Sequence, residues 1–311
     1  MHRFPAGDRR LQRRLWPALS ILVCMLSHAS AGAAVVLRHS DGGELVLDDT
    51  AQRIVTLAPN LAELVFSAGA GERLVGTVEY SNFPPAARQV PRVGDAFRID
   101  LEGVLALRPD LVIAWPSGNP PGALQKLARL GIKVWRIEIH SPEEIADSVE
   151  HIARAAGSEP TGLALATQLR QRLEALRLEH ADKTPVSYFY QVSARPLYTV
   201  NGAHIISRAL ALCGANNVFA GLSVLAPQVS REAVVAVNPM ALIAPRAANE
   251  PADLEAWRDW PAMRAVRNQA LFYLPADSIS QATPRLLDVL DSACRLVDEA
   301  RHRAMKESAA D

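Results

Sequence analysis

The sequence predicts an α/β fold of two doubly wound α/β lobes bridged by one long α-helix, with a ligand cleft between the lobes. The chain has 311 residues, more than the ~250–300 that one hydrophobic core usually organises. Short apolar strands alternate with helices, an order typical of parallel sheets covered on both faces. A strand–helix unit then recurs after a long uninterrupted helical pattern, which indicates a second lobe.

The first residues, 1–31, have the layout of a secretory signal peptide. Five arginines and a single acid, Asp8, precede the apolar run 15–26, and Ala29-Ser30-Ala31 suits cleavage. The run is shorter than the ~20 residues that a membrane-spanning helix needs. We therefore expect residues 1–31 to be removed on export, most simply to a periplasm.

The charge balance argues against a nucleic-acid-binding protein, and the cysteine count indicates a disulfide. The chain carries 33 basic and 33 acidic side chains, and loss of residues 1–31 removes five Arg and one Asp to leave 28 and 32. Nucleic-acid-binding proteins carry a basic surplus. Cys213 and Cys294 remain as an even pair, and in an oxidising compartment we expect a disulfide between them. Two buried thiols are the alternative.

The residues after the signal predict a small hairpin and then the N-terminal lobe. Residues 32–50 form the hairpin, whose strands flank Asp41-Gly42-Gly43. The lobe covers residues 51–158, with Asn60 as a possible cap of its first helix and Ser141 opening a capping box before its last. Its strands are expected at 53–57, 74–78, 111–115 and 134–137, and its helices at 61–68, 101–107, 124–130 and 142–156.

Residues 159–183 are predicted to form a linking helix, because leucines recur there at helical spacing. One more covering helix of the first lobe is the alternative. The C-terminal lobe follows over residues 184–306, opening with a strand at 186–192 and a helix at 207–213, and residues 307–311 form a tail.

One unit occurs in both lobes at a constant offset of 130 residues. It consists of a helix with Glu in its first turn, a proline stop and a buried strand. Its two copies suggest homologous lobes, and a cleft between lobes is a preferred ligand site. Residues 100–114 and 230–244 share Glu102/Glu232, Val104/Val234, Ala106/Ala236, Pro109/Pro239, Ile113/Ile243 and Ala114/Ala244.

Three segments, 53–59, 74–85 and 107–115, resemble in order and spacing the helical-backbone substrate-binding proteins of ABC importers for metal chelates. Pro227–Glu232 and Ala282–Arg285 resemble the members of that family that bind cobalamin. The resemblance implies a periplasmic protein, not an enzyme, that captures cobalamin or a related corrinoid. It would deliver this transported ligand to an inner-membrane ABC permease with its ATPase, act as a monomer, and carry no cofactor.

The resemblance also implies roles for single residues. Tyr80, Trp115 and Asp277 match positions that line the family's cleft, where aromatic faces suit a planar macrocycle. Glu102 and Glu232 match the glutamates, one per lobe, that dock on arginines of the permease. The alternative for both glutamates is a favourable place at a helix N-terminus.

The chain departs from the family at several cleft positions. Ala226 replaces a tryptophan, and only Phe97 could substitute for another. After Asp277, Ser278 and Gln281 stand among positions that hold aromatic residues and an arginine in the family. We take Phe97, Ser278 and Gln281 as candidate ligand-binding residues. A related corrinoid such as cobinamide, haem or a ferric siderophore are the alternative ligands.

His204 is a further candidate, because it precedes a helix and could line the cleft or ligate a metal axially. The histidines form no i,i+4 pair and no His-x-His motif, so no resident metal site is expected. No nucleophile elbow or phosphate-binding loop occurs in the sequence. A ligand sensor or interaction protein without a transport role remains an alternative.

Overall fold

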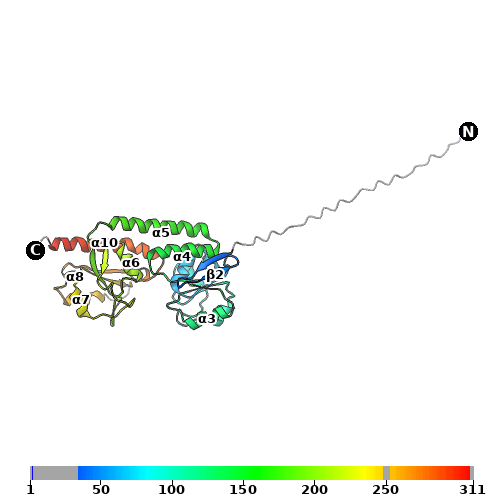
Figure 1. Ribbon diagram of the computed structural model, residues 1–311, viewed down its shortest axis with the longest axis horizontal. Coiled ribbons are helices and arrows are strands. Elements are labelled where there is room, and N and C mark those ends of the chain that lie inside the picture. Colours follow the sequence, from blue (N-terminus) through cyan, green and yellow to red (C-terminus); the bar gives the residue numbers. More distant parts are fainter. Residues whose placement is uncertain (1, 3–33, 248–252, 309–311) are drawn as a thin grey trace. The chain divides into compact units, whose positions relative to one another are not determined.

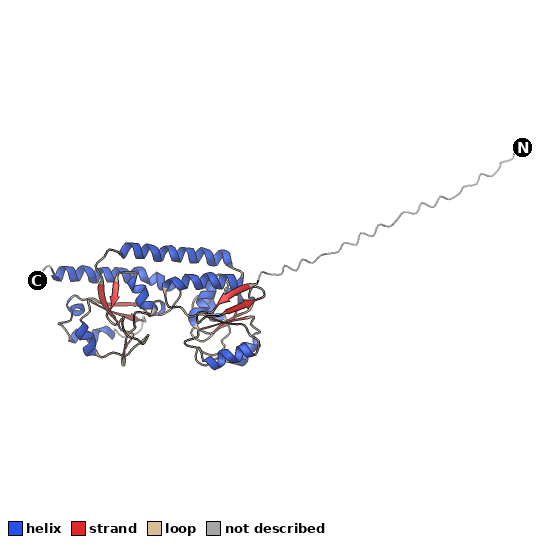
Figure 2. Ribbon diagram, viewed as in Figure 1, coloured by secondary structure: helices blue, strands red, loops and turns tan. Residues whose placement is uncertain are grey.

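The computed structural model describes residue 2, residues 34–247 and residues 253–308. The predicted signal peptide, residues 1–31, lies outside the described residues except for residue 2. In the described part, no helix combines the length and the apolar character that crossing a membrane requires. Two α/β lobes and a long helix beside them confirm the predicted fold class (Figures 1 and 2).

The N-terminal lobe is built on a four-stranded parallel sheet with the order β4-β3-β5-β6. Every residue of β3 and β5 is buried, as expected for central strands covered on both faces. The predicted hairpin is also present, as the antiparallel pair β1 and β2. The strands are β1 (Val35–Arg38), β2 (Glu44–Leu47), β3 (Ile54–Thr56), β4 (Leu74–Gly76), β5 (Leu111–Ala114) and β6 (Val134–Arg136).

The helices of this lobe differ from the prediction mainly at their starts. Asn60 is not a cap, because it lies inside α1. The helix begins at Pro59, where the missing N–H of proline costs no helical hydrogen bond. Ser141 does cap α4 by accepting from the Glu144 N–H, and the Glu144 carboxylate accepts from the N–H of His140 at 2.6 Å. The helices are α1 (Pro59–Ser67), η1 (Gly71–Arg73), η2 (Pro85–Gln89), α2 (Leu101–Ala106), α3 (Pro121–Arg129) and α4 (Pro142–Ala156).

The C-terminal lobe has its own parallel sheet, in the order β10-β7-β11-β12. Its helices are short except for the last. The strands are β7 (Val186–Tyr190), β8 (Ser193–Ala194), β9 (Leu197–Tyr198), β10 (Ala215–Asn217), β11 (Ala241–Arg246) and β12 (Leu271–Pro275). The helices are α6 (Ile205–Ala211), α7 (Arg231–Val237), η3 (Asp253–Asp259), α8 (Arg264–Arg267), α9 (Ala276–Ile279) and α10 (Pro284–Ser308).

The sequence repeat corresponds to a structural repeat. Its two strands, β5 and β11, hold the same third position in the order of their sheets. Its two helices, α2 and α7, are both capped by a side chain, since Asp100 accepts from the N–H of Gly103 and Ser230 from that of Ala233. Buried and exposed positions alternate identically along 101–106 and 231–236. The two lobes therefore repeat one architecture.

The linking helix α5 (Glu159–His180) buries one narrow stripe of side chains, including Leu169, Leu173 and Leu176. It packs closely on α4 at Gly162, where a Cβ would lie 2.1 Å from the Cβ of Ala153. The 25-residue helix α10 is longer than α5 and was not among the predicted elements.

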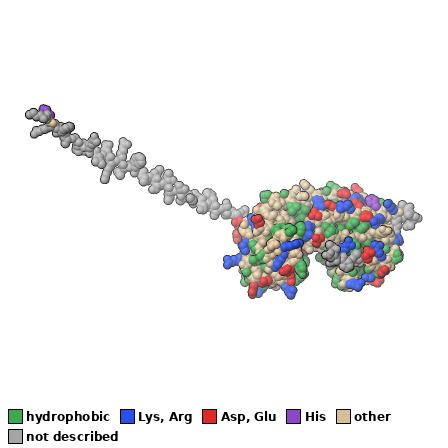
Figure 3. All heavy atoms as spheres, turned by 180° about the vertical axis from the view of Figure 1, so that it is seen from behind, with side chains coloured by type: hydrophobic (Ala, Val, Ile, Leu, Met, Phe, Trp, Pro, Cys, Tyr) green, Lys and Arg blue, Asp and Glu red, His purple; other side chains and the backbone are tan. Residues whose placement is uncertain are grey.

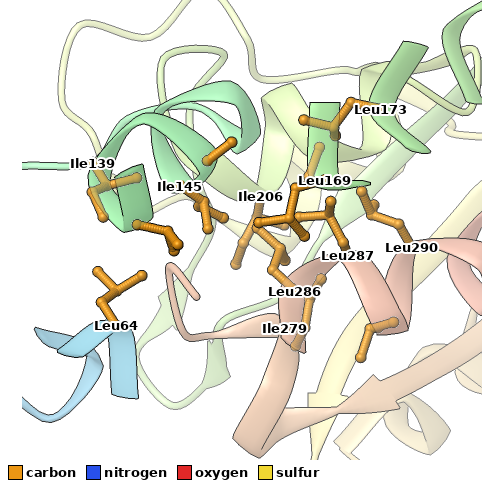
Figure 4. Close-up of a cluster of buried hydrophobic side chains, with 14 of the residues drawn as sticks. Leu64, Ile139, Ile145, Leu169, Leu173, Ile206, Ile279, Leu286, Leu287 and Leu290 are labelled. Atoms are coloured by element: carbon orange, nitrogen blue, oxygen red, sulfur yellow. The ribbon is translucent and has the colours of Figure 1, made fainter. Parts of the chain in front are cut away.

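The helices α4, α5, α6 and α10 share one hydrophobic cluster that also includes residues of both sheets. Figure 4 shows Leu64 of α1 and Ile145 of α4 on one side of it, and Ile206 of α6 and Leu287 of α10 on the other. Since one cluster runs through both lobes, their separation would expose buried apolar surface. We therefore expect limited movement of one lobe against the other.

The predicted disulfide is confirmed. Cys213, two residues after the end of α6, is bonded to Cys294 of α10, and the bond spans 81 positions of sequence. Both residues are buried. The bond attaches α10 to the sheet-covering helix of the C-terminal lobe.

Candidate functional site

The cleft between the lobes contains two adjoining cavities, of about 240 and 290 Å³, which share Pro59 and Gln281. Each is lined by side chains of both lobes. Figure 3 shows the surface hollowed between the lobes, with acidic and basic side chains interspersed. The first cavity is lined by Pro59, Glu63, Tyr80, Asn82, Phe83, Arg88, Asp277, Gln281 and Arg285. The second is lined by Ala58, Pro59, Asn60, Trp115, Ser117, Ile137, Glu138, Ile139, His140, Ala203, His204, Ile205, Leu225, Ser280, Gln281 and Ala282.

The cavities lie where the parallel strands end. Trp115 follows β5 directly, Glu138 follows β6 by two residues, and Asp277 follows β12 by two residues. Open α/β sheets place ligands outside the carboxyl ends of their strands. Both sheets therefore direct their carboxyl ends toward the same cleft.

Several contacts hold the side chain of Trp115, an aromatic residue of the cleft, in place. Its indole Nε1–H donates to Glu138 Oε1 at 2.8 Å, and the other carboxylate oxygen accepts from the Ser117 N–H at 3.1 Å. The ring lies so close to Gly118 that a Cβ there would be 2.0 Å from ring atoms. Phe97 meets the ring edge-on, with the centroids 6.5 Å apart. The indole is thus fixed in place before any ligand binds.

Tyr80 extends from the N-terminal lobe with 79% of its surface exposed. Its backbone has a φ of +66°, a left-handed conformation that few non-glycine residues adopt. The following turn is anchored, because Ser81 Oγ lies 2.9 Å from Thr77 Oγ1 and the N–H of Asn82 donates to the Tyr80 carbonyl at 2.9 Å. This turn directs an uncovered aromatic ring into the first cavity.

A buried ion pair joins the lobes at the base of the first cavity. The Arg285 guanidinium of α10 donates to both carboxylate oxygens of Glu63 of α1, at 2.7 and 3.0 Å. The Glu63 side chain is only 4% exposed. The guanidinium also lies over the Phe83 ring, 4.1 Å from its centroid, and 3.6 Å from Asp277. The hydrogen bonds with Glu63 raise the pKa of Arg285, so this cation is fully engaged.

His204 lies on the C-terminal side of the second cavity, directly before α6. Its Nδ1 accepts a hydrogen bond from the N–H of Ile206 at 3.2 Å, which caps the helix. Burial lowers the pKa of His204 to about 4. The neutral ring is therefore the form present near pH 7.

The remaining predicted site residues are not all brought together. Gln281 lines both cavities, and Asp277 lines the first. Ser278 lines neither cavity; its hydroxyl donates to Asp277 Oδ1 at 3.3 Å. Phe97 also lines neither, although it is 66% exposed beside Trp115. On the C-terminal side, Leu225 adds an aliphatic wall that the sequence analysis did not include.

A comparison with known protein families assigns the chain to one of them. The family model described as periplasmic binding protein matches residues 54–278. The chain belongs to the periplasmic binding protein family.

Individual members of the family are also similar to this chain. The vitamin B12-binding protein of Vibrio cholerae is 39% identical over 245 residues, which cover 78% of this chain and 88% of the relative. The crystal structure of the periplasmic vitamin B12 binding protein BtuF of Vibrio cholerae has a TM-score of 0.74 at 38% identity, covering 81% of this chain and 98% of that one. The periplasmic heme-binding protein BhuT in complex with two hemes has a TM-score of 0.71 at 25% identity, covering 80% and 98%.

In this periplasmic binding protein, Glu102 and Glu232 occupy equivalent exposed positions in the first turns of α2 and α7. Hydrogen bonds from its own backbone N–H and from the Ser230 hydroxyl lower the pKa of Glu232, so the carboxylate is ionised at neutral pH. Neither residue lines the two cleft cavities. The repeat thus presents one exposed carboxylate on each lobe.

A larger cavity, of about 730 Å³, lies away from the cleft, between the β1–β2 hairpin, α3 and the edge strand β6. Leu45, Leu124 and Ile132 are among the residues that line it. No Phe, Tyr or Trp lines it, and it involves the N-terminal lobe alone. The interlobe cavities therefore remain the better candidate site in spite of their smaller volume.

Glu179, His180 and Asp298 line neither cleft cavity, and their ligand atoms lie within 4.8 Å of one another. The sequence analysis did not identify this group, because only two of its members are adjacent in the chain. The ammonium of Lys183 lies 2.9 Å from Asp298 Oδ2 and 3.6 Å from Glu179 Oε1. A lysine therefore already balances these carboxylates.

The sequence analysis missed Glu138, Gly118 and Glu63 as parts of the site. Glu138 could have been found, because it follows a predicted strand on the side where ligands bind. Gly118 and Glu63 gave no such signal, since their importance comes from a ring and a guanidinium that the fold brings to them.

Proposed function

We propose that this protein binds a corrinoid, with cobalamin as the first candidate, in the interlobe cleft and delivers it to an ABC importer in the inner membrane. Residues 1–31 would direct its export as a cleaved signal peptide. The observation that carries the proposal is the fixed aromatic side of the cleft, Trp115 with Tyr80, in a chain 39% identical to a vitamin B12-binding protein. The corrinoid is then cargo rather than a cofactor.

The charges of the cleft favour a corrinoid over haem. Among the residues that line the two cavities, the acids are Glu63, Asp277 and Glu138, and the arginines are Arg88 and Arg285. Arg285 is paired with the buried Glu63. The remaining charged residues of the two linings are one arginine, Arg88, and two acids, Asp277 and Glu138. Haem carries propionate carboxylates that need cationic partners, whereas a corrin carries neutral side-chain amides. A cleft without a cationic surplus suits amides better.

Calorimetric titration of the processed protein with cyanocobalamin, cobinamide and haemin tests the ligand. We expect saturable heat with one or both corrinoids and weaker binding of haemin. Tight binding of haemin with no heat from either corrinoid would contradict the proposal. The Trp115→Ala variant serves as a control that the measured heat comes from the cleft.

We propose that Glu102 and Glu232 form charge-assisted contacts with basic residues of the permease. Their equivalent exposed positions, one per lobe, would set the orientation of docking. Replacement of both by alanine should abolish corrinoid-dependent growth of a cell that relies on this protein, and should leave ligand affinity unchanged.

A matched control replaces two other exposed glutamates, Glu72 in the N-terminal lobe and Glu255 in the C-terminal lobe. This variant should support growth as the unaltered protein does. Normal growth with the Glu102→Ala, Glu232→Ala double variant would show that docking depends on other residues.

A further inference from the structure

The ring of His204 has a fixed arrangement of donor and acceptor atoms. A backbone N–H can only donate, so the hydrogen bond from Ile206 to Nδ1 at 3.2 Å requires that Nδ1 carry no proton. In a neutral imidazole the proton then resides on Nε2. Burial keeps the ring neutral near pH 7, because it lowers the pKa of His204 to about 4.

The Nε2–H group is consequently a donor that belongs to the cleft. His204 lines the second cavity together with Trp115 and Glu138 of the other lobe. Both oxygens of Glu138 are already used by Trp115 and Ser117. Among the described residues, no hydrogen bond from Nε2 of His204 is found, and its one side-chain bond is the cap to Ile206. A half-buried donor in a cavity favours a ligand that brings an acceptor.

Coordination of a metal would need the opposite arrangement. A metal ligand must offer a lone pair, and Nε2 could do so only if the proton moved to Nδ1. That change would break the cap of α6. Capping hydrogen bonds stabilise a helix, so the fold itself favours the donor form of Nε2.

We propose that His204 donates its Nε2–H to a carbonyl oxygen on the rim of the bound ligand, of the side-chain amide class, and does not coordinate the ligand's metal. The inference rests on the proposed function, because a corrin supplies amide carbonyls around its rim. It implies that the axial ligands of the metal are those with which the corrinoid arrives. His204 would then select for the periphery of the macrocycle rather than for its metal.

The decisive variant is His204→Asn. Asparagine is among the best N-cap residues, so α6 should stay capped, but its side chain is too short to present the donor to the cavity. His204→Ala removes both the cap and the donor and separates the two effects. The probe is diaquocobinamide, whose axial waters exchange readily, titrated into the full processed protein and followed by visible absorption.

For the unaltered protein we expect binding without the spectral change that imidazole coordination to cobalt produces. His204→Asn should bind with affinity lower by roughly tenfold, the effect of one hydrogen bond, and should keep its thermal unfolding midpoint. An imidazole-type spectrum that His204→Asn abolishes would overturn the proposal, as would equal affinity of the two proteins.

Long-range ¹H–¹⁵N NMR of the histidine rings tests the inference without any ligand. A proton on Nε2 of His204 is the expected result, and a proton on Nδ1 would overturn it. This measurement also separates the inference from the proposed function: if the ligand-free tautomer is as expected and no corrinoid binds, the proposed function fails, and the hydrogen bond to an amide fails with it.

Discussion

The two lobes share one frame and differ in what they present to the cleft. Both have a four-stranded parallel sheet in which the repeated strand takes the third position. The N-terminal lobe supplies the aromatic side chains Tyr80 and Trp115, and the C-terminal lobe supplies His204, Leu225 and polar groups of 276–281. The repeat conserves the core-forming unit, while the side chains that face the cleft come from segments outside it.

This difference shows where binding properties arise in a duplicated fold. The repeated helix and strand are held by apolar burial and caps, which any ligand would leave unchanged. Trp115, Glu138 and Asp277 stand just after strands, in segments that vary more readily in sequence than the repeated core. An aromatic wall on one lobe and a polar, aliphatic wall on the other can therefore be varied separately.

The largest effect is expected from removal of the disulfide, which cross-links the C-terminal lobe. Replacement of Cys213 and Cys294 by serine should lower the free energy of unfolding by about 4.5 kcal/mol, the chain-entropy value for a loop of this length. Urea unfolding of oxidised protein measures this loss. Reduction of the unaltered protein should cause a similar change, and no change in either experiment would contradict the prediction.

The second test removes the ion pair between Arg285 and Glu63 that joins the lobes. Arg285→Met leaves the Glu63 carboxylate buried without its partner and should lower the free energy of unfolding by about 3 kcal/mol. Urea unfolding measures the loss. Arg170→Met is the control, because its ion pairs with Asp147 and Glu150 are more exposed and such pairs contribute at most about 1 kcal/mol. Equal effects would mean that the interlobe pair stabilises no more than a surface pair.

The third test compares the two walls directly. Trp115→Ala should weaken corrinoid binding by about 2 kcal/mol, or roughly thirtyfold, because it removes an aromatic face that is already held in place. Leu225→Ala removes less apolar area and should cost about 1 kcal/mol. Calorimetry gives both values. A larger effect at Leu225 would reverse the assignment of the dominant wall.

The fourth test concerns pH. The pKa of His204 is lowered from 6.5 to about 4 by burial, so between these values the unfolded chain binds a proton that the folded protein does not. The contribution of His204 to stability is therefore fully present above pH 6.5 and is lost as the pH is lowered toward 4. His204→Asn should show a shallower fall in urea unfolding at pH 7, 6 and 5. An unchanged slope would show that His204 titrates normally.

Much of the fold could be predicted from the sequence, because buried parallel strands have continuous apolar sequences, such as residues 111–114. The α10 helix was missed, although its apolar positions have helical spacing, because the sequence analysis assigned no element after residue 244. Asn60 was wrong as a cap because the proline before it starts the helix. Caps are decided by one residue, and their prediction is accordingly less secure than that of strands.

The site was predictable only in part. Trp115 stands at the end of an obvious strand, and the family resemblance pointed to Tyr80 and Asp277. The partners of these residues could not be found, since the contact of Arg285 with Glu63 joins positions 222 apart in the chain. The donor form of His204 depends on a hydrogen bond two residues away, which no motif records.

The hydrophobic cluster shared by the two lobes has a consequence for unloading. Because the walls of the cleft are joined through α5, α10 and a common core, we expect the cleft to open little by itself. A bound ligand would then leave slowly, because few spontaneous fluctuations widen its exit. Release at the membrane would therefore require mechanical work by the permease on the two lobes, applied at exposed points such as Glu102 and Glu232.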